Sequence, residues 1–390
     1  MDFIIPEELK QLQLLARKFV LQELLPLEEL VEEKDEFPED IRRELKAKAV
    51  RLGLWDYAAP VEYGGSGVGM VGMSLVSEEV GRVSPSVGFQ SGIMSGIQGG
   101  GMIDHNTLAV ATKGQIEKYL APVIRGQQEF FIALTEPNTG SDVANIETRA
   151  VRKGDKYILN GNKMFITSAD TSDFGFVIAV TDWQKRGKGG ITCFIVERGT
   201  PGFTIGRKVR LMGRRGLKNF ELSFDDCAVP AANVLGKEGQ GLPLALAALT
   251  PLRILIGAVF TGTMERLLDM SKRYAKQRVT FGKPLAERQA VQWMLVEMAM
   301  NIQASRMMTW NAAWEADHGL DIRTKAAMIK VFVTEACFKA ADQALQIHGG
   351  AGYTKDLPIE RIFRDVRMYR IGEGPTEVMQ MVIARDLLRD

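Results

Sequence analysis

The period of the hydrophobic pattern changes twice along this chain of 390 residues, and that change restricts its fold more than any other feature. Up to about residue 125, and again after Gly241, apolar residues recur every three or four positions, which is typical of helices. Between Phe130 and Leu235, short apolar runs alternate with polar turns, which is typical of strands without intervening helices. The order therefore predicts an α+β protein with an antiparallel sheet or small barrel in the middle.

Individual elements follow from the same pattern and from the breakers that interrupt it. Helices are expected over residues 3–25, 73–80, 250–276, 285–318 and 323–347, with a last one from Thr376. Strands are expected over residues 174–180, 191–196 and 220–224. Asn160-Gly161, at the centre of residues 156–163, predicts a strand followed by a tight turn. The long helices near the end of the chain predict an up-and-down bundle.

Composition excludes several classes of partner and site. The 49 Lys and Arg residues nearly balance the 48 Asp and Glu residues, so no electrostatic argument favours nucleic acid. With only three histidines, a histidine-rich metal centre is not expected. The cysteines are widely spaced in apolar contexts and predict buried thiols in a reducing compartment; they are Cys193, Cys227 and Cys337.

The start of the chain carries no basic, apolar or Arg-rich leader pattern. We also expect no window of apolar residues long enough to span a membrane, and no membrane partner. The protein is therefore expected to be cytoplasmic, or the mature form of an organellar matrix protein.

Two glycine-rich segments near the end of the chain are the candidate ligand-binding features. The segment from Gln346 to Tyr353 contains three glycines, which permit close approach of the backbone to a bulky ligand. About twenty residues later, Glu373 stands between two glycines, so its carboxylate can project into a cavity as a base. Taken alone, each segment also fits an ordinary turn.

Three blocks in the same order resemble the acyl-CoA dehydrogenase family, and the resemblance covers essentially the whole chain. The first block is Leu134–Asp142, and the second is Arg278–Pro284 with Gln289 and Gln292. The third keeps the spacing of the family's C-terminal signature at Gln346, Gly349, Gly350, Gly352, Tyr353, Asp356, Arg361 and Asp365. The resemblance implies an N-terminal helical domain (1–125), a middle antiparallel β domain (126–238) and a C-terminal four-helix bundle (239–390).

The resemblance also implies a reaction, the FAD-dependent α,β-dehydrogenation of an acyl-CoA thioester to the 2-enoyl-CoA. Glu373 matches the catalytic base that takes the α-proton while the β-hydride passes to flavin N5. Some family members place the base just before an arginine on the first long bundle helix, but here Leu252 precedes Arg253. A cofactor is required because no side chain accepts hydride. The Rossmann pattern is absent after the strands, and FAD binding without that fold is what the resemblance implies.

Contacts to cofactor and substrate carry over position by position from the same resemblance. FAD contacts are expected from Leu134, Thr135, Phe165, Ile166, Thr167, Gln289, Gln346, Gly349, Gly350 and Thr376. A neighbouring subunit is expected to supply Arg278, Thr280 and Phe281. Contacts to the acyl-CoA substrate are expected from Ser141, Arg253, Gly372 and Gly374. No metal ligands are expected.

Two departures from the family pattern bear on the acyl group. Gly372 stands where straight-chain members usually carry Tyr, and the missing wall favours a branched or alicyclic group. Gln90 stands where the glutaryl-CoA type would offer an arginine to the distal carboxylate, which argues against a dicarboxylate.

The resemblance also implies an electron acceptor and an oligomeric state, and it leaves other activities open. Electrons would pass to an electron-transfer flavoprotein, and the chain end at Asp390 favours a homotetramer that is not membrane-bound. An enoyl-CoA reductase or an acyl-CoA oxidase on the same fold stays open as an alternative. A non-catalytic flavoprotein is a third, although the presence of Glu373 argues against it.

Overall fold

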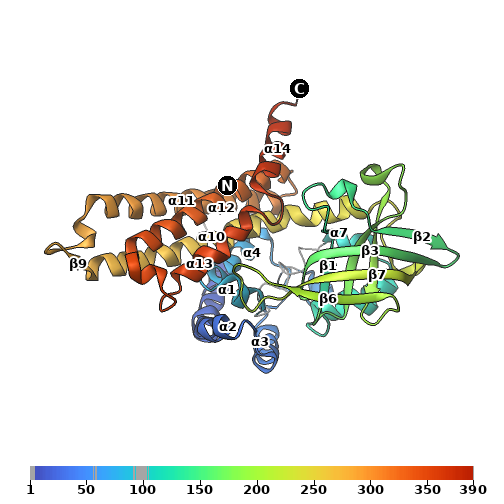
Figure 1. The fold of residues 1–390 in the computed structure, drawn as a ribbon, viewed down its shortest axis with the longest axis horizontal. Coiled ribbons are helices and arrows are strands. Elements are labelled where there is room, and N and C mark those ends of the chain that lie inside the picture. The colour runs from blue at the N-terminus through green and yellow to red at the C-terminus, as the bar shows by residue number, and fades with distance from the viewer. Residues whose placement is uncertain are drawn as a thin grey trace.

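The computed structural model describes residues 5–55, 57, 59–90, 93, 103 and 105–389. Helices from the two ends of the chain pack together, and the strand-rich middle forms a separate layer to one side (Figure 1). The expected order of helices, strands and helices is confirmed. Domain boundaries near residues 125 and 238 stay a prediction.

The N-terminal part is helical, as expected. The helix expected over residues 3–25 is α1 (Glu7–Phe19), continued by a π-helical segment (Val20–Leu24) and a 3₁₀ turn (Leu25–Leu27) at Pro26. Its first two residues lie outside the described part of the chain. The further helices are α2 (Glu28–Lys34), α3 (Glu39–Arg51), α4 (Met70–Val80), α5 (Pro85–Gln90), α7 (His105–Val110), α8 (Lys113–Gln115) and α9 (Ala121–Ile124).

The middle of the chain forms an eight-stranded sheet in the order β6-β7-β3-β2-β4-β5-β8, with β1 also paired to β4. The strands are β1 (Phe130–Ala133), β2 (Arg149–Lys153), β3 (Lys156–Thr167), β4 (Phe174–Val180), β5 (Ile191–Glu197), β6 (Phe203–Val209), β7 (Asn219–Pro230) and β8 (Val234–Leu235). The expectation of a purely antiparallel sheet is wrong, because β1 and β2 both pair with β4 in parallel. The three predicted strands correspond to β4, β5 and β7.

The predicted turn at Asn160-Gly161 is also wrong. Both residues lie inside β3, where the pairing with β7 shifts register and Gly161 has a φ of 148°. The actual hairpin turn is Gly154-Asp155, closed by the pair Lys153 and Lys156. Pairing with β7 over most of β3 satisfies backbone groups that a turn at residue 160 would leave unpaired, so tertiary pairing overrides the local turn preference.

The C-terminal part is a bundle of long helices. Its elements are α10 (Gly241–Gln277), β9 (Val279–Thr280), β10 (Lys283–Pro284), α11 (Gln289–Asp317), α12 (Arg323–His348), α13 (Ile359–Arg367) and α14 (Thr376–Leu387). Helix α10 begins nine residues earlier than expected, because Pro251 is accommodated inside it rather than near its start. At 1.5 Å per residue its 37 residues span about 55 Å, from the sheet to the β9–β10 hairpin (Figure 1).

The expectation that no window is apolar enough to span a membrane is wrong for α10. This one described helix meets that criterion by length and composition, but 56% of its most apolar stretch is buried inside the fold. It packs against α4, α11 and α12, and its first turns touch β5. A helix that is covered on several sides by protein is apolar for that reason, and its composition alone is weak evidence for a membrane span.

The cysteines are buried free thiols, as predicted. Burial raises the pKa of Cys227 to about 11, and it also raises the pKa of Cys193 and Cys337. All three are therefore protonated near neutral pH and are poor nucleophiles.

Candidate active site

The predicted base lies in a strained turn. Residues 371–375 connect a 3₁₀ turn (Met368–Arg370) to α14, and the N–H groups of Ile371 and Gly372 both donate to the carbonyl of Met368, at 2.8 and 2.9 Å. Glu373 has a φ of 57° and Gly374 a φ of 96°. A left-handed conformation at a non-glycine residue costs free energy and is maintained only when its surroundings enforce it.

Helix α12 fixes both ends of this turn through one carboxylate. Glu335 accepts hydrogen bonds from Arg370 Nε and from Thr376 Oγ1, both at 2.8 Å. The hydroxyl of Thr376, a predicted FAD contact, is therefore engaged with protein. Sequence reasoning missed Glu335 because 35 and 41 residues separate it from its partners.

Arg253 contacts the turn of residues 371–375, which we call the base turn. This contact agrees with the prediction that Arg253, Gly372 and Gly374 belong to one substrate site. The Nε of Arg253, on α10, donates to the carbonyl of Glu373 at 3.2 Å. A Cβ on Gly374 would lie 3.5 Å from Arg253 Nη2 and 2.6 Å from Met379 Cε. The structure therefore brings together Arg253, Gly372, Glu373 and Gly374, and the positive φ of residue 374 makes any side chain there strained.

Burial raises the pKa of Glu373, and three cations oppose the rise: Arg253, Arg214 and Lys330. Lys330 lies on α12 and is fully buried, and its Nζ has no hydrogen-bond partner within the described ranges. Burial, reinforced by Arg253, lowers the pKa of Lys330 to about 8. Neither Lys330 nor Arg214 carries a sequence signal, because a single basic residue on a helix or loop is usually solvated.

The raised pKa of Glu373 predicts an acid limb in the pH dependence of catalysis. A base works only when deprotonated, so kcat/KM should rise with pH through a pKa above 4.5. Replacing Lys330 by Met removes a charge that opposes the rise, so the limb should move to higher pH. The measurement is kcat/KM against pH for wild type, Lys330→Met and a control, Lys339→Met, which changes an exposed lysine of the same helix. An unmoved limb in folded Lys330→Met would show that this ammonium does not act on Glu373.

The β domain brings five predicted FAD contacts together. Lys163 Nζ donates to the carbonyl of Leu134 at 3.0 Å, and the N–H of Met164 donates to the carbonyl of Thr135 at 2.9 Å. These bonds hold residues 134–135 beside the end of β3, which contains Phe165, Ile166 and Thr167. Ile166 is buried, and the Thr167 hydroxyl donates to Asn219 Oδ1 at 3.0 Å.

Phe165 and Ser141 are both exposed residues of the β domain. Phe165 is 49% exposed and has a φ of 62°. An aromatic ring that stays half-exposed on a strained backbone fits a position completed by a flat ligand. Ser141, a predicted substrate contact, is also exposed, in the loop that follows Glu136.

A buried ion pair holds this region, and sequence reasoning did not assign it. Lys163 Nζ and Glu136 Oε1 are 2.8 Å apart, and both side chains are almost completely buried. Glu136 also accepts the N–H groups of Glu147 and Thr148, at 2.5 and 2.9 Å. Burial alone would raise the pKa of Glu136, but Lys163 and these donors lower it overall. Glu136 therefore joins the first signature block to β3.

Removing one member of this pair should destabilise the protein strongly. Lys163→Met leaves Glu136 buried without its countercharge, which costs about 3–5 kcal/mol in comparable buried pairs. The matched control is Lys156→Met, an exposed lysine of the same strand. Urea unfolding followed by circular dichroism should show a large loss of stability for Lys163→Met only; equal stability of the two variants would contradict the assigned role.

The remaining predicted FAD contacts lie at the other end of the molecule. Gly349 and Gly350 begin a 3₁₀ turn, and a Cβ on either would meet no atom within 4 Å. The ring of the preceding His348 packs against that of Tyr274 on α10, with ring centroids 4.4 Å apart, so this turn lies near the end of α10. The exposed residues Gln346, Arg278 and Gln289 belong to the same end of the bundle.

The β9–β10 hairpin at this end is shaped by a residue that sequence reasoning missed. Arg288 Nη2 donates to the carbonyls of Thr280 and Phe281, at 2.5 and 3.3 Å. Phe281 has a φ of 50°, and 96% of its surface is exposed. Within one chain, this end and the β domain are far apart (Figure 1), so the structure does not bring all predicted FAD contacts together. The open glycines and the two exposed aromatic rings fit FAD if two chains each supply half of the site.

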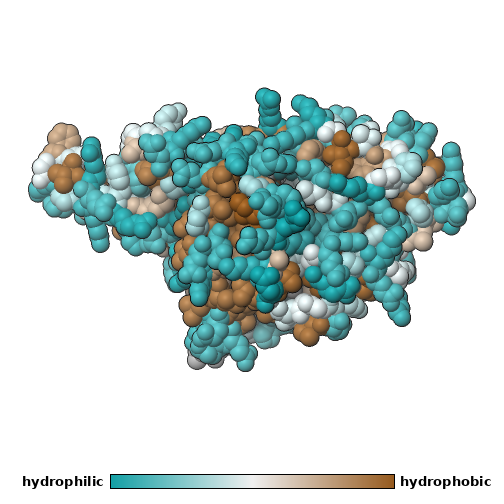
Figure 2. Space-filling view, turned by 90° about the horizontal axis from the view of Figure 1, so that it is seen from below, coloured by the Kyte–Doolittle hydropathy of each residue, from teal (hydrophilic) through white to brown (hydrophobic). Residues whose placement is uncertain are grey.

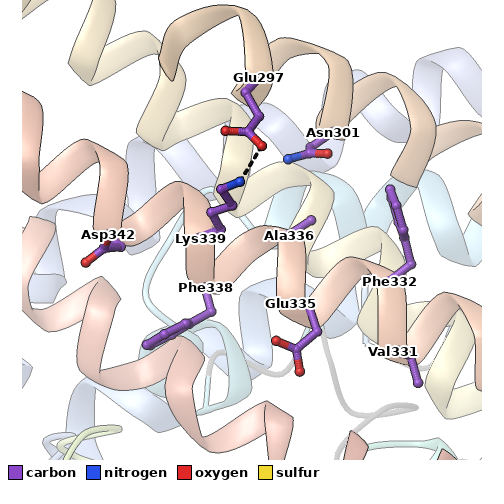
Figure 3. Close-up of a pocket in the computed structure, with 9 residues that line it drawn as sticks. All are labelled: Glu297, Asn301, Val331, Phe332, Glu335, Ala336, Phe338, Lys339 and Asp342. Carbon is purple, nitrogen blue, oxygen red and sulfur yellow. Dashed lines mark hydrogen bonds and ion pairs between the residues drawn. The ribbon is translucent and has the colours of Figure 1, made fainter. Parts of the chain in front are cut away.

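A separate cavity of about 550 Å³ lies between α11 and α12 (Figure 3). Its lining includes the ion pair of Glu297 with Lys339 and the ring of Phe332. None of the residues predicted to contact FAD or acyl-CoA lines it. Glu335, which fixes the turn that carries Glu373, is also part of the lining.

Three family descriptions match consecutive parts of the chain. They are the N-terminal, middle and C-terminal domains of acyl-CoA dehydrogenase, which match residues 6–127, 132–227 and 239–388. The acyl-CoA dehydrogenase of Bacillus subtilis (strain 168) is 38% identical, over 98% of this chain and 99% of that protein. Acryloyl-CoA reductase (NADH) of Anaerotignum propionicum is 37% identical, over 100% and 96%. Mitochondrial isobutyryl-CoA dehydrogenase of Dictyostelium discoideum is 36% identical, over 98% and 90%.

Solved structures agree with these relatives. Butyryl-CoA dehydrogenase of Megasphaera elsdenii superposes with a TM-score of 0.92 at 34% identity, and each chain is covered fully. A chain in the structure of the electron transferring flavoprotein of Acidaminococcus fermentans gives 0.92 at 35%, again over the whole of both chains. The FAD complex of PigA gives 0.92 at 26%, over 99% of each chain.

The chain belongs to the acyl-CoA dehydrogenase family. The predicted fold, an N-terminal helical domain followed by a middle β domain and a C-terminal helical domain, is confirmed. The protein is an oxidoreductase that acts on a CH–CH bond of an acyl-CoA, and FAD is its cofactor.

Proposed function

We propose that the protein oxidises a short acyl-CoA to the 2-enoyl-CoA, with Glu373 as the base that takes the α-proton. The observation that carries the proposal is the position of Glu373, in a left-handed turn fixed by Glu335 and Arg253, with a pKa raised by burial. A raised pKa brings a carboxylate closer to the acidity of an activated α-carbon. FAD, when bound, supplies the acceptor for the β-hydride.

The other predicted residues hold cofactor and substrate in this proposal. Leu134, Thr135, Phe165, Ile166 and Thr167 contact the flavin end of FAD. Gln289, Gln346, Gly349, Gly350 and Thr376 also contact FAD, and the Thr376 hydroxyl donates to Glu335 as well. Ser141, Arg253, Gly372 and Gly374 contact acyl-CoA.

The decisive variant is Glu373→Gln, which removes the base but keeps the shape of the side chain. We expect FAD to stay bound, while the anaerobic bleaching of its absorbance by acyl-CoA slows by about 100- to 10,000-fold. The matched control is Glu377→Gln, an exposed carboxylate on α14, which should bleach like wild type. Bleaching of Glu373→Gln at the wild-type rate would refute the assigned base.

We propose further that two chains complete each FAD site, within a homotetramer. Arg278, Thr280 and Phe281 lie on the exposed hairpin end, far from the β domain of their own chain (Figure 1). Large apolar side chains are exposed on α11 and α14: Trp293, Val296, Met300, Met381 and Leu387. Figure 2, which views the molecule from below, shows further apolar surface gathered in the central part of that face. Association would bury such surface and bring the two halves of the site together.

Arg278→Ala tests this shared site. A charge-assisted hydrogen bond contributes about 1.5–3 kcal/mol, so its loss should weaken FAD binding by roughly 10- to 100-fold. Arg273→Ala, which changes an exposed arginine in the last turns of α10, is the control. The measurements are the FAD content after dialysis and the mass in solution. Unchanged FAD retention by Arg278→Ala would contradict the assignment.

For the acyl group we propose a short branched or alicyclic skeleton, supported by Gly372 and by the relative named for isobutyryl-CoA. The side chain of Met368 limits the space that Gly372 provides. A Cβ on Gly372 would lie 2.7 Å from Met368 Sδ, so a methionine occupies part of the space that glycine opens. Faster bleaching by isobutyryl-CoA or cyclohexanecarbonyl-CoA than by butyryl-CoA would support this skeleton, and the reverse order would refute it.

The direction of the reaction and the electron acceptor are also proposed. An electron-transfer flavoprotein is the proposed acceptor, supported by the similarity to a chain in the Acidaminococcus fermentans structure. The relative named acryloyl-CoA reductase favours a second candidate, the reverse reduction of an enoyl-CoA on the same residues. The proposed location is the cytoplasm or an organellar matrix.

A further inference from the structure

Arg214 is a buried cation to which the proposed reaction assigns no contact with the substrate. It lies in the loop between β6 and β7, with a φ of 57°, and only 8% of its surface is exposed. Its backbone N–H donates to Asp365 of α13, which holds the loop against the C-terminal helices. A buried arginine with a left-handed backbone lowers the stability of the fold unless interactions with a ligand or partner offset this cost.

The guanidinium of Arg214 lies among rings and a thioether. Its carbon is 5.4 Å from the ring centre of Phe89 and 5.3 Å from that of Tyr369, and Nη1 is 4.0 Å from Met368 Sδ. Its buried Nε has no hydrogen-bond partner among the residues that the structure describes, and its guanidinium forms no ion pair with a carboxylate among them. Aromatic faces stabilise a cation only modestly, whereas guanidinium groups bind carboxylates as a two-pronged fork.

The guanidinium of Arg214 lies close to the turn that carries Glu373. Met368 touches Arg214 on one side, and on the other it lies against Gly372, the residue before the base. Arg214 is also one of the three cations that oppose the rise in the pKa of Glu373. The sulfur of Met368 therefore links the surroundings of Arg214 to the turn that carries Glu373.

The presence of Gln90 does not exclude a dicarboxylic substrate, because its side chain binds the loop that carries Arg214. Gln90 Nε2 donates to the carbonyl of Gly216 at 2.7 Å, so the side chain at residue 90 is used to hold the loop that carries Arg214. A cation near this end of the site comes from residue 214 instead.

We propose that Arg214 binds a carboxylate at the end of the acyl group remote from the thioester, so that the substrate is the CoA monothioester of a short dicarboxylic acid. The proposal rests on the proposed dehydrogenation and adds a charged end to the acyl skeleton. Arg214 acts in specificity, since it contacts the acyl group and takes no part in proton or hydride transfer. The rings of Phe89 and Tyr369 exclude water around the pair and strengthen it.

The test compares thioesters that differ only in the terminal carboxylate. Purified holoenzyme is mixed anaerobically with glutaryl-CoA against valeryl-CoA, adipyl-CoA against hexanoyl-CoA, and 2-methylsuccinyl-CoA against 2-methylbutyryl-CoA. In at least one pair the carboxylate should raise kcat/KM for flavin bleaching by about 100-fold or more. Arg214→Met should abolish this ratio and Arg214→Lys should retain part of it. Arg215→Met, whose guanidinium donates to the Glu32 carbonyl, should leave the ratio unchanged.

Binding provides a second readout that does not depend on turnover. In the Glu373→Gln protein, calorimetric titration should show that Arg214→Met raises the Kd of the preferred dicarboxylic thioester but not that of its monocarboxylic partner. Equal kcat/KM within every wild-type pair would overturn the proposal, and this comparison needs no variant. A ratio that survives in Arg214→Met would overturn it as well. Absence of bleaching by all thioesters would instead overturn the proposed dehydrogenation, and tighter binding of the dicarboxylic member would then still support the subsite.

Discussion

The position of α10 is the constraint on which the rest of the structure depends. Its first turns pack on the sheet, its middle is covered by α4, α11 and α12, and its last residues lead into the β9–β10 hairpin. Arg253 stands on this helix and contacts the base turn, so the same element that joins sheet and bundle also places a residue of the candidate site. Burial on several sides explains both its apolar composition and its continuity through Pro251.

Burial and the nearby cations shift the pKa of Glu373 in opposite directions. Burial favours the protonated form of Glu373, while Arg253, Arg214 and Lys330 favour the ionised form. These cations come from α10, a loop of the β domain and α12, so the balance exists only after the three parts of the chain have packed. The left-handed backbone of Glu373 is a further cost, offset by the bonds that Glu335 makes on both sides of the turn.

The overall fold was predictable because hydrophobic period reports directly which faces are buried. The errors occur where tertiary contacts override a local rule, as at Asn160-Gly161, where pairing with β7 replaces a turn, and at Pro251, which lies inside a helix. Glu373 and Arg253 stood out through motif spacing. Glu335 did not, because its partners are distant in sequence. Lys330 and Arg214 did not either, because an isolated charged residue gives no sign of burial.

The unbroken course of α10 has a consequence for how such a chain can change in length. Each residue of an α-helix turns the chain by about 100°, so one inserted or deleted residue within α10 would rotate everything beyond it by that angle. An insertion before Arg253 would turn its guanidinium away from the Glu373 carbonyl or displace the first turns from the sheet. Variation in length is therefore restricted to loops such as 184–190, whereas α10 tolerates substitution but has a fixed residue count.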